Sequence, residues 1–152
     1  MGSESALWTA TRDRLAEYGE LTRFEPSIVR GIPDVYYALL EDHGDSPAYG
    51  QGWLELKHVH AAPKRPRTPV RYKYRAGQVE FLARHWRLRG HAYVLAQVGK
   101  LYLLHNGDAP SQGVGVNLPL DKLQATARMV WGQPWNAGNT LDLLDILTQY
   151  RS

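Results

Sequence analysis

The chain carries GIPDVYYALL at residues 31–40 and GWLELK at residues 52–57, and these two stretches decide how it folds. Both are rich in aromatic and aliphatic residues and follow Gly or Pro, a pattern that predicts two β-strands. Successive side chains of a strand point to opposite faces, so Glu55 and Lys57 project on the same side. Asp34 opens the first of these strands. The sequence therefore places two carboxylates and one ammonium where they can converge.

Two carboxylates and an ammonium suit the hydrolysis of a phosphodiester. Hard oxygen ligands bind Mg²⁺ or Mn²⁺ better than zinc, and the ion lowers the pKa of a bound water. Asp34 and Glu55 would be the ligands, with the Leu56 carbonyl as a third because Leu56 lies between Glu55 and Lys57. Lys57 would hold the attacking water or stabilise the phosphorane. The alternative for Glu55 and Lys57 is an ordinary surface ion pair on an edge strand.

These motif residues resemble the signature of the PD-(D/E)XK nuclease superfamily, with Asp34, Glu55 and Lys57 at its three positions. The resemblance implies a restriction-endonuclease-like core, in which helices flank a mixed central β-sheet. It also implies a metal-dependent nuclease. Many members add a glutamate from the first helix, and Glu4 resembles it; the alternative is a first-turn charge that the helix dipole favours. Glu25 is a rival for the same role.

Gln78 begins a predicted helix, where the virus-type replication-repair nucleases of the superfamily carry a similar glutamine. A neutral amide can orient water or a phosphate oxygen, whereas the alternative is an exposed helix glutamine without a role. His58, His60 and His85 lack the spacing of a metal-binding pair, so we interpret them as structural or close to DNA.

Length and composition predict one globular domain. The chain has 152 residues, of which 43% are hydrophobic, and no cysteine, which excludes disulfides, thiolate zinc sites and cysteine nucleophiles. Neither a signal peptide nor a membrane span is recognisable, so we expect a soluble, cytoplasmic protein, one that a virus could also encode. We expect a single nuclease domain over 1–152, with its core at about 3–105 and a C-terminal helical extension at about 118–151.

Periodicity and breakers predict an α/β order with a mixed sheet. The expected helices cover 3–18, 76–89, 120–131 and 140–150. The expected strands cover 21–25, 34–40, 53–59, 92–98 and 101–105, and residues 41–52 read as a hydrophilic loop.

Positive charge is concentrated between residues 58 and 100, which hold ten Lys and Arg residues against the single acid Glu80. Such a block suits a polyanion, although a solvated basic surface without a partner is the alternative. The candidate DNA-binding residues are Arg23, Arg30, Lys64, Arg65, Arg67, Arg71, Tyr72, Lys73, Tyr74 and Arg75, the two tyrosines by stacking on a base or sugar. No helix-turn-helix or zinc finger is present, so we expect recognition of DNA shape.

Size and element order resemble the archaeal-type and viral Holliday junction resolvases. This resemblance implies a homodimer that cuts two strands of a four-way junction in recombination and repair. Trp131, Trp135 and Leu143 could form part of the dimer interface or, alternatively, the domain core. A general nickase, flap or end-processing nuclease of the same superfamily and a catalytically inert DNA-binding module remain alternative hypotheses.

Overall fold

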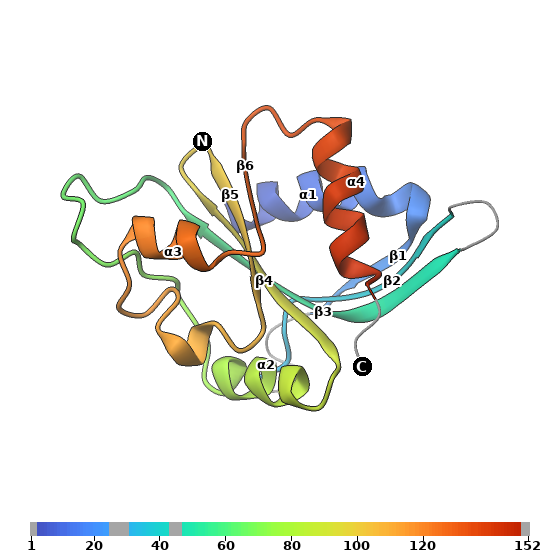
Figure 1. Ribbon diagram of the computed structural model, residues 1–152, viewed down its shortest axis with the longest axis horizontal. Coiled ribbons are helices and arrows are strands. Elements are labelled where there is room, and N and C mark those ends of the chain that lie inside the picture. The colour runs from blue at the N-terminus through green and yellow to red at the C-terminus, as the bar shows by residue number, and fades with distance from the viewer. Residues whose placement is uncertain (1–2, 25–30, 43–46, 150–152) are drawn as a thin grey trace.

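Six strands form one mixed sheet in the order β1-β2-β3-β4-β5-β6 in the computed structural model, which describes residues 3–24, 31–42 and 47–149 (Figure 1). The strands are β1 (Gly19–Arg23), β2 (Val35–Glu41), β3 (Ala48–Val59), β4 (His91–Val98), β5 (Leu101–Asn106) and β6 (Met129–Gly132). Only β3 and β4 are parallel, and the other neighbours are antiparallel. A parallel pair needs a crossover, which helix α2 supplies.

The helices are α1 (Glu4–Leu15), α2 (Gln78–Arg87), α3 (Leu120–Thr126) and α4 (Ala137–Leu147). Ser3 caps α1, since its hydroxyl accepts a hydrogen bond from Ala6 N at 3.0 Å. Asn136 and Asn139 form a reciprocal capping box at the start of α4. The helices lie on both faces of the sheet, so the molecule has three layers (Figure 1).

Two hydrophobic clusters hold these layers together, one on each face of the sheet. Alternate residues of each central strand belong to opposite clusters, as Leu95 and Val94 of β4 illustrate. The first cluster joins the sheet to α1 and α4, and the second joins it to α2 and α3. Trp131, Trp135 and Leu143 are buried in the first cluster, so these side chains belong to the domain core.

The α/β class, the mixed sheet and the flanking helices are confirmed, while several boundaries predicted from the sequence are wrong, and two of these differences change the sheet. The strand expected at 53–59 begins at Ala48, because the preceding polar residues pair with β2 down to Glu41. The helix expected at 120–131 ends at Thr126, and Met129–Gly132 adds β6 to the edge of the sheet. The C-terminal extension is therefore not purely helical.

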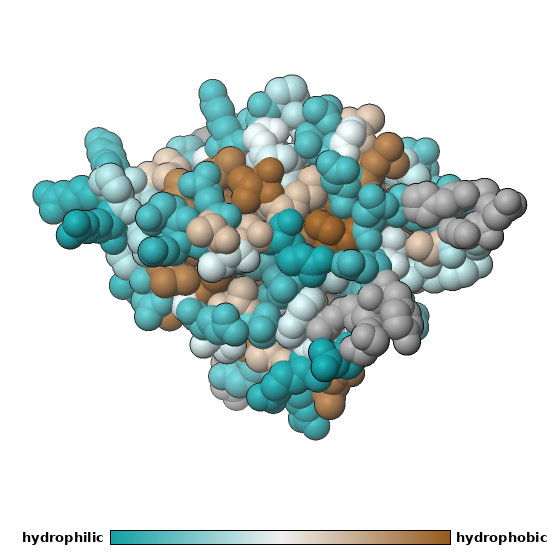
Figure 2. Space-filling model, viewed as in Figure 1, coloured by the Kyte–Doolittle hydropathy of each residue, from teal (hydrophilic) through white to brown (hydrophobic). Residues whose placement is uncertain are grey.

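Large exposed apolar side chains are few in the described ranges, and Leu40 and Tyr49 of the β2–β3 hairpin are two of them. On the face shown in Figure 2, hydrophobic patches are small and separated by hydrophilic residues. Across the same ranges, no helix has the length and hydropathy needed to cross a membrane.

Candidate active site

Asp34 and Glu55 meet where β2 begins. The pairing of β2 with β3 starts at Val35 and Leu54, and no described strand pairs with β3 beyond Leu54 on that side. The Asp34 side chain takes the place of the missing strand, since its Oδ2 accepts a hydrogen bond from Leu56 N at 3.0 Å. In return, Asp34 N donates to Glu55 Oε1 at 3.0 Å. Glu55 is thus fixed by the backbone of Asp34, and Asp34 by the backbone of Leu56, the residue after Glu55.

The same geometry defines the direction of the Leu56 carbonyl. In a β-strand the N–H and C=O of one residue point to the same edge. Because the Leu56 N–H is directed toward Asp34, its carbonyl faces that edge too. This oxygen therefore lies on the same side of β3 as the two carboxylates.

Lys57 is held in a closed environment, with only 2% of its side chain exposed. Its ammonium lies 3.4 Å from Glu55 Oε2 and 3.2 Å from Gln78 Oε1. It also donates to the Lys73 carbonyl and lies 5.3 Å from the centre of the Tyr74 ring. Two of its three donors are used by the Lys73 carbonyl and Gln78, while Glu55 Oε2 lies within ion-pair distance without accepting a hydrogen bond, so the lysine is held and one donor stays available.

Gln78 is completely buried and positions Lys57. Its Oε1 accepts hydrogen bonds from Lys57 Nζ and from Arg75 N, at 3.2 and 2.8 Å. The alternative interpretation, an exposed helix glutamine, is therefore wrong. Its buried Nε2 has no hydrogen-bond partner in the described part of the chain.

Two glycines bring the Asp34 segment against the start of α2. Gly31 and Gly77 both have positive φ, +88° and +87°, a conformation that L side chains rarely adopt. A Cβ on Gly77 would lie 3.2 Å from the Gly31 Cα. This close approach of two backbones places Arg75 and Gln78 beside the carboxylates, and the sequence analysis missed it.

The two carboxyl groups carry very different proton affinities. Burial, followed by the hydrogen bond and the charge of Asp34, raises the pKa of Glu55 to about 9. Burial opposes ionisation of Asp34 as well, but hydrogen bonds with Glu55, Leu56 N and Arg75 outweigh it and lower the pKa of Asp34. The pair therefore holds one proton between the two acids at neutral pH.

The residues present fit a divalent cation such as Mg²⁺. Glu55 Oε2 is buried and accepts no hydrogen bond from any described residue. A cation would ligate this oxygen and replace the shared proton. No described cluster joins three or more His, Asp or Glu side chains at metal-binding distance. This ligand count suits Mg²⁺, which is usually held by one or two carboxylates together with waters and substrate phosphates.

Glu4 lies near this pair without completing a three-carboxylate cluster. Burial raises the pKa of Glu4, the charge of Lys57 lowers it and the charge of Asp34 raises it, so both charges lie within electrostatic range of Glu4. Glu4 is also in the first turn of α1, where the helix dipole favours an anion. Both interpretations of Glu4 remain compatible with its position. The rival Glu25 lies outside the described residues, as does Arg30.

The basic segment, residues 60–75, is fixed to the fold although it forms no strand. Val70 N and Tyr72 N donate to the carbonyls of Leu118 and Gly115, at 3.0 and 2.8 Å. From Val70 to Lys73 its side chains alternate, with valine and tyrosine buried and the two cations exposed. The exposed cations are Lys64, Arg65, Arg67, Arg71 and Lys73, and Arg23 of β1 is exposed as well.

One prediction for this segment is wrong. Tyr72 is only 6% exposed and packs in the second hydrophobic cluster, so its ring is not free to stack on a base. Tyr74 is half-buried, and its hydroxyl donates to the Val114 carbonyl at 2.8 Å. Its ring faces Lys57 and thus supports the site from within.

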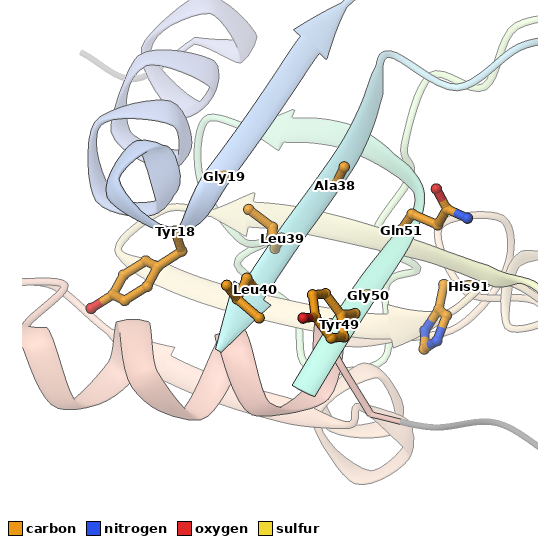
Figure 3. A pocket seen from close by; sticks show the side chains of 9 residues that line it. All are labelled: Tyr18, Gly19, Ala38, Leu39, Leu40, Tyr49, Gly50, Gln51 and His91. Carbon is orange, nitrogen blue, oxygen red and sulfur yellow. The ribbon is translucent and has the colours of Figure 1, made fainter. Parts of the chain in front are cut away.

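The histidines do not join the carboxylate pair. His85 stacks on Phe81, with ring centres 4.1 Å apart. His58 and His60 line a separate cavity of about 620 Å³ together with Gln97 and Gln133. An apolar pocket of about 520 Å³ lies between Tyr18 and His91, at the end of β2 and β3 opposite Asp34 (Figure 3).

No family model matches the sequence, and no curated protein is similar enough to indicate a relative.

Proposed function

We propose that the protein is a metal-dependent endonuclease that hydrolyses phosphodiester bonds of DNA. The observation that carries the proposal is the placement of the Asp34 and Glu55 carboxyl groups on the open edge of β3, each held by a backbone N–H, beside a buried lysine. A buried like-charge pair is unfavourable by itself. A divalent cation removes that cost, and phosphodiester hydrolysis uses the same ion.

Each residue has a defined part in this proposal. Asp34, Glu55 and the Leu56 carbonyl would hold Mg²⁺ or Mn²⁺. Once bound, the ion supplies Lewis acidity and a water of lowered pKa. Lys57 places its ammonium 3.4 Å from Glu55, where it can hold the attacking water or stabilise negative charge on the phosphorane. Gln78 fixes Lys57 in that position.

The basic segment would supply the affinity for DNA. Its exposed cations project from a backbone tied to the segment after β5, so they form a preorganised surface. Contacts of this kind bind phosphates and recognise shape instead of base sequence. The exposed cations of the basic segment therefore support DNA as the substrate class.

Among DNA substrates we propose the four-way junction, cut by a homodimer. A two-fold dimer presents two active sites to a two-fold substrate. A labelled panel of four-way junction, duplex, nicked duplex and flap with Mg²⁺ tests this. Paired symmetric nicks confined to the junction are the expected result, and equal cleavage of all substrates would contradict it.

The site is tested by Asp34→Asn and Glu55→Gln, which keep the size of each side chain. Both variants are expected to lose cleavage by about a thousandfold or more while they retain DNA binding. Glu80→Gln, an exposed acid on α2, is the matched control and should cleave as the wild type does. Metal-dependent cleavage that survives in both site variants would refute the proposal.

A further inference from the structure

Arg75 ends the basic segment and contacts the carboxylate pair. Its Nη2 is 3.1 Å from Asp34 Oδ1, and its charge lowers the pKa of Glu4, Asp34 and Glu55. The guanidinium is therefore in contact with Asp34 and within electrostatic range of the other two acids. Its side chain is 35% exposed, against 2% for Lys57, so it can leave the site without opening the core.

The guanidinium and a divalent ion would compete for the same carboxylate. One oxygen of Asp34 accepts a hydrogen bond from Leu56 N and the other from Arg75, so both oxygens are engaged. A cation that ligates Asp34 must share it with Arg75, and two positive charges on one carboxylate repel each other. Of the two arrangements, only the one without Arg75 on Asp34 avoids this repulsion.

We infer that Arg75 takes the place of the divalent cation in the metal-free protein and turns from Asp34 to a phosphate of the DNA when the ion binds. The inference rests on the proposed function and goes beyond it, because it assigns Arg75 as a residue that couples metal binding to substrate binding. Arg75 N donates a hydrogen bond to Gln78 Oε1 at 2.8 Å, so the backbone of Arg75 can stay in place while its side chain moves. A guanidinium fork suits a phosphate at the end of that movement.

Calorimetric titration with Mn²⁺ in the absence of DNA tests whether Arg75 and the metal ion compete for Asp34. Arg75→Gln should bind Mn²⁺ about tenfold more tightly than the wild type, which corresponds to ~1.4 kcal/mol. Arg75→Lys keeps the charge and should lie between the two. Arg67→Gln removes the same charge from an exposed position of the basic segment and should change the affinity by less than about twofold.

Thermal unfolding provides a readout that does not depend on cleavage. Without metal, Arg75→Gln should unfold at a lower temperature than the wild type, because Asp34 loses its partner. Saturating Mn²⁺ should bring the two proteins to the same Tm, since the ion takes over the role of the guanidinium. A difference in Tm that persists unchanged in saturating Mn²⁺ would overturn the inference.

DNA binding tests whether Arg75 contacts a phosphate of the DNA once the metal ion is bound. In Ca²⁺, Arg75→Gln should bind a junction or duplex more weakly than the wild type despite its tighter hold on the metal. Equal Mn²⁺ affinity of Arg75→Gln and wild type would overturn the exchange and leave the proposed function intact. If the wild type binds no Mn²⁺, or if Asp34→Asn does not abolish that binding, the proposed function is overturned, and the inference with it.

Discussion

Stability of the metal-free protein is expected to fall as pH rises above 7, because Glu55 is protonated in the folded protein and ionised in the unfolded chain. Burial and the neighbouring Asp34 raise the pKa of Glu55 from 4.5 to about 9. At roughly pH 7 to 8 the folded state therefore holds one more proton than the unfolded state. The free energy of unfolding then falls by about 1.4 kcal/mol for each pH unit.

Two histidines, His58 and His105, have the opposite sign, and they limit the pH range in which the slope can be assigned to Glu55. Burial lowers the pKa of His58 and His105, so the unfolded chain binds more protons at those positions as pH falls below their ordinary value of 6.5. Their contribution to stability is lost in acid, and it is complete above about pH 7. The slope at higher pH thus reports Glu55.

Urea unfolding, followed by tryptophan fluorescence at several pH values in EDTA, measures this slope. Glu55→Gln cannot ionise and should give a flat profile above pH 7, whereas the control Glu80→Gln should retain the slope of the wild type. Mg²⁺ should also flatten the wild-type profile, because the ion replaces the proton. Parallel profiles for wild type and Glu55→Gln in EDTA would refute the protonated Glu55.

Two further changes test the support of the site and its surface. Gly77→Ala should lower the free energy of unfolding by about 1–2 kcal/mol in urea titrations, because Ala is strained at positive φ and its Cβ would contact Gly31. The control Gly132→Ala should change the free energy of unfolding far less, because the added Cβ has space there. Three charges of the basic segment are removed together by Arg65→Gln, Arg67→Gln and Arg71→Gln. In fluorescence anisotropy, the slope of the logarithm of the DNA-binding constant against the logarithm of salt concentration should then be smaller by about three units. An unchanged slope would mean that the segment does not contact phosphate.

The same-face placement of Glu55 and Lys57 and the position of Asp34 at the start of a strand follow from local rules that a sequence displays, whereas the approach of Asp34 to Glu55 depends on the pairing of β2 with β3. Alternation along a strand put Glu55 and Lys57 on one face, and Pro33 marked the start of the strand that Asp34 opens. The capped first helix and the crossover helix also follow from periodicity and breakers. These features depend on neighbours within a few residues, so one sequence suffices to predict them.

Contacts between distant segments could not be predicted in the same way. The Arg75 to Asp34 ion pair and the approach of Gly31 to Gly77 join parts of the chain more than forty residues apart. Tyr72 was interpreted as a DNA contact because tyrosine and cations alternate there, and only the segment at Gly115 reveals which of them points inward. The short strand β6 was missed because its pattern competes with the helix that precedes it.

A purely structural role for the carboxylate pair would be difficult to reconcile with its energetics. Buried ionisable groups seldom stabilise a fold better than neutral groups of the same shape, and the Asp34 and Glu55 pair needs a proton and two cations to be tolerated. Glu55→Gln keeps the hydrogen bond from Asp34 N and removes the cost of holding that proton, so the metal-free variant should be more stable than the wild type at pH 8. A stabilising substitution at a fully buried position marks a residue whose presence serves function at the expense of the fold. If Glu55→Gln instead unfolds more readily at pH 8, the pair is structural and the proposed metal site loses its physical basis.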